Sequence, residues 1–245
     1  MDTTVAKGLA VLEALARADG PVRLADLAQQ LGLQKSNVHR LLQTLVALGF
    51  AAQEPGTSRY LPTLKLWELG VGVLQAHPAR RAAAPFLQEL HRATAETVSL
   101  TVLDGDEVLY LEKLLSPRPL RFSTRPGSRA PAAMTASGKA MLAQLDDPRP
   151  MLERSTAKWS QARDLDVEAL LAELEQVRRE GYAVSEGGWT PGLVGIAAAI
   201  PAGEGPQAAI TVSGPIERIS EAKREQIVEA VLNACARIGE ASGPL

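Results

Sequence analysis

The sequence predicts an α+β fold: a small N-terminal domain of three helices and a β-hairpin, a connecting helix, and a larger C-terminal domain with an antiparallel sheet flanked by helices. Three observations predict this fold. Apolar residues recur at helical spacing through the first 48 residues. Short β-rich runs separated by turn residues recur between positions 97 and 215. Long amphipathic patterns bracket that strand-rich stretch, as expected when helices pack on a sheet.

Composition narrows the class of protein. The chain has 245 residues, of which 46% are hydrophobic and 22% charged, a balance that excludes a mainly disordered chain. No apolar run approaches the ~20 residues that span a bilayer, and the N-terminal residues lack the pattern of a signal peptide. Cys235 is the single cysteine, so neither an intrachain disulfide nor a multi-cysteine metal site is expected. We expect a soluble, cytoplasmic protein without a membrane partner, metal or cofactor.

The first domain is expected at residues 1–62. Helical apolar patterns cover residues 4–18, residues 24–31, which end at Gly32, and residues 35–48, which end at Gly49. Residues 50–62 read as two short strands around a Pro-Gly turn. Three helices and a hairpin of this length make a compact domain.

A connecting helix is expected at 63–77, with a second domain at 78–245. Residues 63–76 are helical in pattern but apolar on two sides, so both sides must be buried, most simply against the first domain and a second copy of the chain. The stretch 77–85, "HPARRAAAP", then indicates a boundary. Leu64, Trp67, Val71 and Leu74 form one apolar side, and Leu66, Leu69 and Val73 form the other.

The second domain mixes strands and helices. Residues 97–115 form a hairpin signal around "DGDE", and residues 192–201 and 206–215 read as buried strands. Residues 164–181 form a strongly periodic helix closed by Gly181. Residues 217–241 read as a closing helix.

The spacing of Ala28, Gly32 and Val38 is typical of a helix-turn-helix. The motif needs a small residue where its helices meet, a glycine for the turn four positions later, and an apolar residue six positions after that. The second helix would present its first residues to base edges in the major groove, and the hairpin would form a wing against the phosphates. The alternative is a solvated helix in a protein–protein module, but no acidic residue occurs from Ala28 to Gly49. The predicted DNA-binding residues are Lys35, Ser36, Asn37, His39, Arg40, Thr44, Ser58 and Arg59.

The charge of the first domain predicts that it works in pairs. Residues 1–62 hold six Lys or Arg and five Asp or Glu, so the net charge is 6 − 5 = +1. Because affinity for DNA depends heavily on phosphate neutralisation, one copy should bind weakly. Two copies in fixed geometry gain by effective concentration.

Together these stretches resemble the IclR family of bacterial transcriptional regulators over nearly the whole chain. The resemblance rests on "LADLAQQLGLQKSNVHRLLQTLVALGF" (24–50), "RYLPTLKLWELG" (59–70), "PAAMTASGKAMLA" (131–143), "EGYAVSEGG" (180–188), "GLVGIAAAIP" (192–201) and "ITVSGP" (210–215). It implies a winged helix-turn-helix, a dimerising linker helix and an effector domain folded like a GAF or PAS sensor. It also implies homodimers or homotetramers that repress or activate catabolic operons in response to a small organic acid or aromatic effector.

The resemblance also implies an effector pocket beside the "SGKAMLA" helix. The backbone N–H groups of Ala136 and Ser137 would hold a carboxylate there; plain helix capping by Thr135 or Ser137 is the alternative. Four further pocket positions map onto this chain, and they lack both the acid and the thiol common in relatives, which makes a bulkier carboxylate, for instance an aromatic one, more plausible. These four positions are Ser185, Gly195, Thr211 and Ser213. The apolar lining would come from Met134, Leu193 and Trp189.

The residues predict a binding protein and not an enzyme. No nucleophile–base pair, metal cluster or phosphate loop assembles, and the apolar neighbours of Cys235 indicate a core position. We therefore predict a sequence-specific regulator that binds double-stranded operator DNA under control of the effector. The alternative is a DNA-binding protein whose C-terminal domain only oligomerises.

Overall fold

The computed structural model describes residues 3–119, 125–201 and 208–242. Its contacts divide the chain into two compact units, Met1–Gln75 and Ala76–Leu245. Within the described residues, the first unit contains a three-stranded sheet and the second a six-stranded sheet. Each unit therefore has its own fold.

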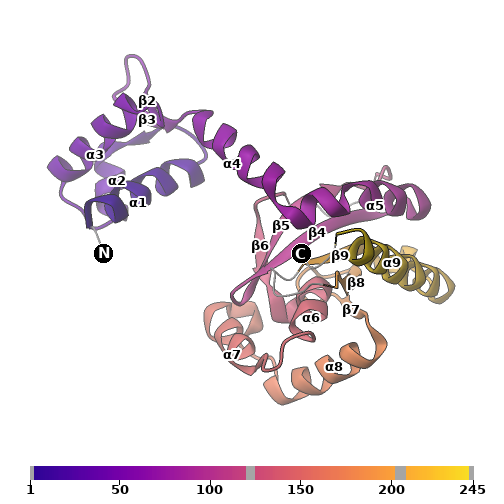
Figure 1. Cartoon of the computed structure of the whole chain (residues 1–245). Helices are drawn as coiled ribbons and strands as arrows, with labels where there is room; N and C mark the ends of the chain where they lie inside the picture. The colour runs from indigo at the N-terminus through magenta and orange to yellow at the C-terminus, as the bar shows by residue number, and fades with distance from the viewer. Residues whose placement is uncertain (1–2, 120–124, 202–207, 243–245) are drawn as a thin grey trace. The chain divides into compact units, whose positions relative to one another are not determined.

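The N-terminal unit is a three-helix domain with a small antiparallel sheet (Figure 1). The sheet order is β1-β3-β2, which confirms the predicted hairpin. The additional strand, β1, is too short to leave a periodic signal in the sequence and is defined by its pairing with β3. The elements are α1 (Thr3–Arg17), β1 (Val22–Arg23), α2 (Leu24–Gln30), α3 (Lys35–Ala47), β2 (Ala51–Gln53) and β3 (Arg59–Pro62).

The helix-turn-helix spacing is confirmed by the packing of α2 against α3. Ala28 and Val38 are buried, and Gly32 has a φ of 62°, a left-handed conformation that glycine adopts without steric cost. Because the apolar side of α3 is fixed in this core, its opposite side must face solvent. The other core residues are Val11, Leu12, Ala14, Leu15, Leu27, Leu41, Leu42, Leu45, Ala51 and Tyr60.

Helix α4 (Lys65–Ala76) contains no buried residue. It begins after Thr63, whose Oγ1 donates to the Gly49 carbonyl (2.6 Å) and accepts from the Lys65 N–H (3.3 Å). The Lys65 ammonium donates to the Leu48 carbonyl (2.7 Å) and lies 4.6 Å from the centre of the Phe50 ring, so the start of α4 is anchored on the end of α3. Four large apolar side chains in and just before α4 are exposed: Leu64 (76%), Trp67 (65%), Leu69 (53%) and Val73 (73%).

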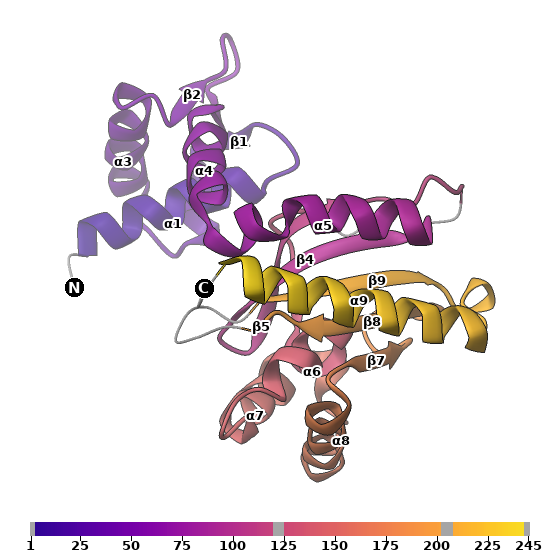
Figure 2. The same ribbon diagram turned by 45° about the vertical axis from the view of Figure 1, so that its right-hand side comes forward.

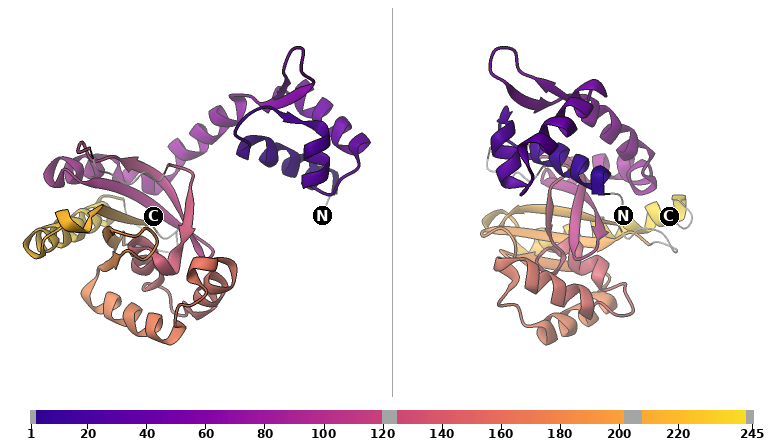
Figure 3. Two further views of the ribbon diagram at one scale, coloured as in Figure 1. Left: turned by 180° about the vertical axis from the view of Figure 1, so that it is seen from behind. Right: turned by 90° about the vertical axis from the view of Figure 1, so that its left-hand side faces the viewer.

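The C-terminal unit is an antiparallel sheet with helices on both faces, as predicted (Figures 2 and 3). Helices α5 (Pro78–Thr94) and α9 (Glu221–Ser242) lie side by side on one face. Helices α6 (Ala136–Leu142), α7 (Arg149–Lys158) and α8 (Val167–Glu180) lie on the side of the other face. The strand order is β6 (Arg129–Pro131), β5 (Glu107–Leu114), β4 (Thr97–Asp104), β9 (Ala208–Pro215), β8 (Leu193–Ala199) and β7 (Ala183–Glu186).

The stretch 77–85, which we expected to mark a boundary, is helical and lies just after the division between the two units at Gln75 and Ala76. It forms the first half of α5, which continues through Pro85. The alanines of this stretch favour helix. Ala79, Ala83 and Leu87 are buried on one side of α5, and this burial offsets the cost of ~3 kcal/mol for a proline inside a helix. We did not predict this helix because we interpreted the stretch as a boundary. The edge strands β6 and β7 were likewise not among the predicted strands.

A β-bulge in β5 decides which of its side chains face α6. β5 pairs with β4, but the register shifts between Leu100 and Thr101, which leaves Leu111 outside the pairing. Side chains alternate along a strand, so Tyr110 and Lys113, three positions apart, would normally lie on opposite faces. The extra residue brings both onto the face that α6 covers, where they line the same cavity.

A buried carboxylate ties four segments of the C-terminal unit together. Glu96 is fully buried and accepts hydrogen bonds from Arg118 (2.5 Å), Arg218 (2.5 Å) and Lys223 (2.6 Å). Burial alone would raise the pKa of Glu96, but the hydrogen bonds from Arg218 and Lys223 outweigh it and hold that pKa below its usual value. The Glu96 carboxylate therefore joins four segments: the start of β4, the segment after β5, the turn after β9 and α9.

Candidate functional site

The solvent side of α3 carries the predicted recognition residues. The side chains of Lys35, Ser36, His39, Arg40 and Thr44 are exposed. Asn37 is partly exposed, and the Thr44 hydroxyl donates to the Arg40 carbonyl one turn earlier (3.0 Å). Each of these side chains donates or accepts hydrogen bonds, as base-edge readout requires.

The hairpin β2–β3 forms the predicted wing. Ser58 is exposed and has a φ of 54°, so it turns the chain into β3, and Arg59 is partly exposed at the start of that strand. The hydroxyl of Thr57 donates to the Glu54 carboxylate, which stiffens the tip. Helix face and wing thus both present polar groups on one small domain.

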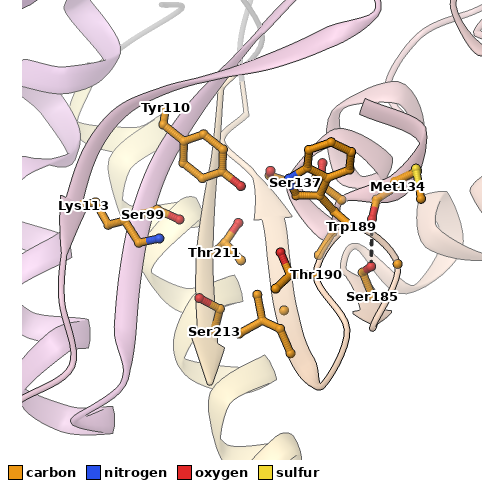
Figure 4. A pocket seen from close by; sticks show the side chains of 15 residues that line it. Ser99, Tyr110, Lys113, Met134, Ser137, Ser185, Trp189, Thr190, Thr211 and Ser213 are labelled. Carbon is orange, nitrogen blue, oxygen red and sulfur yellow. Dashed lines mark hydrogen bonds between the residues drawn. The ribbon is translucent and has the colours of Figure 1, made fainter. Parts of the chain in front are cut away.

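The C-terminal unit contains a partly open cavity of about 230 Å³ between the sheet and the start of α6 (Figure 4). The structure brings all nine residues predicted for the effector pocket to this cavity: Met134, Ala136, Ser137, Ser185, Trp189, Leu193, Gly195, Thr211 and Ser213. The prediction missed six lining residues: Ser99, Tyr110, Lys113, Thr135, Gly188 and Thr190.

The start of α6 is held rigidly at the cavity. Thr135 is the N-cap, and its Oγ1 accepts the N–H of Gly138 (3.1 Å), so one of the free amides of the helix is already satisfied by capping. A Cβ on Gly138 would lie 2.1 Å from the Ala132 carbonyl oxygen, so only glycine allows this close packing. Ala136 and Ser137 follow the cap and are buried at the cavity wall.

The loop between β7 and β8 closes the second wall. The Ser185 hydroxyl donates to the Met134 carbonyl (3.0 Å; Figure 4). A Cβ on Gly188 would lie 2.6 Å from that same carbonyl oxygen, so the loop approaches the chain before α6 closely. Trp189 lines the cavity and makes an edge-to-face contact with Trp159, with ring centres 5.2 Å apart.

Strands β8 and β9 supply the floor. A Cβ on Gly195 would lie 3.5 Å from both Ala136 Cβ and Thr211 Cγ2, which is an ordinary contact distance. Because Gly195 has no side chain, the space that a side chain would fill is part of the cavity. Thr211 is 8% exposed, and its Oγ1 has no hydrogen-bond partner among the described residues. Ser213 lies two positions further on the same strand and also lines the cavity.

The cavity contains a cation that the sequence analysis did not place there. Lys113 enters beside Tyr110, with its ammonium 5.7 Å from the centre of the Tyr110 ring. Burial lowers the pKa of Lys113 to about 8, because the charged form loses hydration. The signal that places Lys113 in the cavity is the bulge in β5, which cannot be read from residue types.

The described residues that line the cavity form no catalytic constellation. Neither histidine nor cysteine is among its described lining residues. Cys235 is buried and its thiol lies 3.4 Å from the Ala198 carbonyl oxygen; burial raises the pKa of Cys235 to about 12, so the reactive thiolate is disfavoured. Within the described residues, no group of three His, Cys, Asp or Glu could hold a metal ion.

These features define a class: a winged helix-turn-helix DNA-binding protein with a separate, cavity-containing domain. Two family models match the chain, "IclR helix-turn-helix domain" over residues 4–55 and "Bacterial transcriptional regulator IclR C-terminal" over residues 71–239. The HTH-type transcriptional regulator KdgR of Escherichia coli is 37% identical over 239 residues, covering 96% of this chain and 90% of that protein. The regulator BhcR of Paracoccus denitrificans is 32% identical over 243 residues, covering 97% and 86%.

Solved structures of transcriptional regulators have the same fold over nearly the whole chain. A putative transcriptional regulator from Rhodococcus superposes with a TM-score of 0.82 at 26% identity, covering 99% of this chain and 98% of that one. An IclR homologue from Microbacterium hydrocarbonoxydans, solved with 4-hydroxybenzoate, gives a TM-score of 0.79 at 24% identity, covering 96% and 97%. The chain belongs to the IclR family of bacterial transcriptional regulators. Like its relatives, it is a DNA-binding regulator and not an enzyme. In the described parts, no helix is long and apolar enough to cross a membrane.

Proposed function

We propose that this chain binds operator DNA as a dimer and that a small carboxylate, bound in the C-terminal cavity, modulates that binding. One observation carries the proposal: residues from three separate stretches, 134–137, 185–195 and 211–213, converge on a single cavity with polar groups and apolar walls. Small-molecule sites combine these two kinds of surface.

For the DNA-binding half, the support is the face of α3. Arg40 suits guanine and Asn37 suits adenine in the major groove, whereas Ser58 and Arg59 of the wing suit phosphates. Val38 is buried and anchors α3 in the core of the domain. Because Arg40 is exposed on the same helix, its side chain has a fixed direction in which to approach DNA. We propose all eight predicted residues as the operator-contacting surface.

For the dimer, the support is the exposed apolar surface of α4. A helix that exposes Trp67, Leu69 and Val73 and buries no residue in its own chain needs a partner surface to remove these side chains from water. Pairing with the same helix of a second copy satisfies both copies at once. Two readers held together then compensate for the charge of only +1 on each.

For the effector, the support is the cavity's size and lining. A volume of about 230 Å³ suits a molecule of more than a few atoms. Trp189, Met134 and Leu193 offer apolar contact, and the hydroxyls around them offer hydrogen bonds. The solved homologue with 4-hydroxybenzoate is a precedent for an organic acid in this fold.

The test pairs DNA binding with ligand binding. Operator fragments selected with the wild-type chain are followed by fluorescence anisotropy, and a panel of carboxylates is screened by calorimetry. Gly195→Val should fill the cavity without adding charge, so it should abolish the ligand's effect while leaving DNA binding and dimerisation intact. Gly195→Ala is the matched control and should respond normally, because its Cβ makes only ordinary contacts. Intact DNA binding with no heat from any acid would instead support a C-terminal domain that only oligomerises.

A further inference from the structure

We propose that Lys113 binds the carboxylate of the effector and that Thr211 binds a second oxygen of the same molecule, so that the effector is a monocarboxylate bearing a hydroxyl or carbonyl oxygen. This inference rests on the proposed effector role of the cavity and specifies its ligand. It places the carboxylate at Lys113 and not at the backbone N–H groups of Ala136 and Ser137, where we first expected it from the family resemblance.

The charge of the cavity carries the first half of the argument. Among the fifteen described lining residues, Lys113 is the one charged side chain, and Tyr110 is the one other titratable group. The groups that face Lys113 from the neighbouring strands, Ser99 on β4 and Thr211 on β9, are neutral hydroxyls. Because the described lining offers an ammonium and no carboxylate, it favours an anion, and a single ammonium matches one carboxylate better than a dianion.

The position of Lys113 across the sheet carries the second half. Lys113 lies opposite Ser99 on β4, and Ser99 lies opposite Thr211 on β9, so the three form one row. Neighbouring strands are ~4.8 Å apart, which places the backbones of Lys113 and Thr211 about 10 Å apart. Figure 4 shows the Lys113 ammonium and the Tyr110 and Thr211 hydroxyls directed toward the space between them. A molecule of several carbons spans that space.

The unsatisfied hydroxyl of Thr211 indicates what the far end of the ligand must provide. Its Oγ1 is buried and has no partner among the described residues, and a buried polar group without a partner costs ~1–3 kcal/mol. A ligand hydroxyl or carbonyl oxygen at this position removes that cost, whereas a purely hydrocarbon chain keeps it. The apolar walls at Met134, Leu193 and Trp189 leave the carbon skeleton between the two polar ends.

The experiment compares acids with neutral partners of the same shape. Calorimetry and tryptophan fluorescence, to which Trp189 contributes, measure binding of gluconate against glucitol and of 4-hydroxybenzoate against 4-hydroxybenzamide and benzoate. In wild type, at least one acid should bind about ten-fold or more tightly than its neutral partner. Lys113→Met should weaken that acid by roughly ten- to a hundred-fold, because a charge-assisted hydrogen bond is lost, and should change the neutral partner by less than about three-fold.

Two variants control for nonspecific effects. Arg92→Met removes one positive charge from the exposed face of α5, outside the cavity, and should leave acid binding unchanged. Thr211→Val keeps the shape of the side chain and should weaken gluconate or 4-hydroxybenzoate while leaving benzoate, which lacks the second oxygen, unaffected or bound more tightly. DNA binding without ligand should be the same in all three variants.

Proton uptake gives a readout that lost packing would not produce. Because the pKa of Lys113 is about 8 without ligand, the side chain is half protonated at pH 8, and a bound carboxylate should complete its protonation. Wild type should therefore take up about half a proton per ligand at pH 8, measured in buffers of different ionisation enthalpy, and Lys113→Met should take up none. Equal binding of acids and neutral partners, or unchanged acid affinity in Lys113→Met, would overturn this inference alone. Failure of every probe to bind would overturn the effector role itself.

Discussion

A charge placed on α4 should separate the protomers that we propose this helix joins. Trp67 is 65% exposed in the single chain and lies among the exposed side chains of Leu64, Leu69 and Val73. Trp67→Glu puts a carboxylate into that surface, whereas Trp67→Phe keeps it apolar and aromatic. The first variant should be a monomer that binds operator weakly, and the second should remain a dimer.

The expected loss of dimer affinity follows from the exposed area. An indole side chain buries about 150–250 Å², so 65% of the midpoint is about 130 Å² per protomer. At ~25 cal/mol per Å² this is about 3 kcal/mol for each protomer, or about 6 kcal/mol for a dimer with two copies of Trp67. That energy corresponds to roughly a 10⁴-fold weaker dimer, before any cost of burying the new carboxylate.

Operator binding should fall with the dimer. Each reader domain carries a net charge of only +1, and loss of the second reader removes an effective-concentration gain of roughly 10²- to 10⁴-fold. Sedimentation equilibrium measures the dimer, and anisotropy compares fragments containing two half-sites with fragments containing one. Only the two-half-site fragment should lose affinity in Trp67→Glu. A stable Trp67→Glu dimer at micromolar concentration, or full affinity for the paired site, would refute the role of α4.

Three further outcomes are expected. Arg40→Ala should weaken operator binding by ~1–3 kcal/mol in anisotropy titrations without lowering the thermal midpoint, and unchanged affinity would remove Arg40 from the recognition surface. Gly138→Ala should destabilise the C-terminal unit by ~1–3 kcal/mol in thermal unfolding, because its Cβ meets a backbone oxygen 2.1 Å away, whereas Gly20→Ala, whose Cβ would meet no atom within 4 Å, should be close to neutral. Glu96→Gln should lower the thermal midpoint at pH 7 relative to wild type. Because the pKa of Glu96 is lowered in the folded chain, this difference in midpoint should shrink as the pH falls below 4.5, the usual pKa of a glutamate. A difference in midpoint that does not depend on pH would contradict the charge network.

The sequence was sufficient to predict the structure where a single periodicity of apolar residues determines which side of a helix is buried. In α3 the helical repeat alone separates Val38 and Leu41, which are buried, from His39 and Arg40, which are exposed. Gly32 was identifiable because the turn of a helix-turn-helix needs a left-handed residue at that spacing. The nine predicted pocket residues came instead from the family resemblance, since no local pattern indicates that residues 134 and 211 lie at one cavity.

The charge of the cavity depends on a feature that residue types do not encode. Leu111, the extra residue of the bulge, is an ordinary apolar strand residue, and an uninterrupted alternation along β5 would separate Lys113 from Tyr110. The residues predicted for the pocket are all uncharged. Because of the bulge, the described lining also includes the Lys113 ammonium, opposite the unsatisfied hydroxyl of Thr211. The expected ligand changes accordingly, from a bulky, for instance aromatic, carboxylate at the start of α6 to an oxygen-bearing acid lying across β5, β4 and β9. The affinity of the regulator for its effector should then depend on the protonation of Lys113, a dependence that the hydroxyl groups of the cavity alone would not produce.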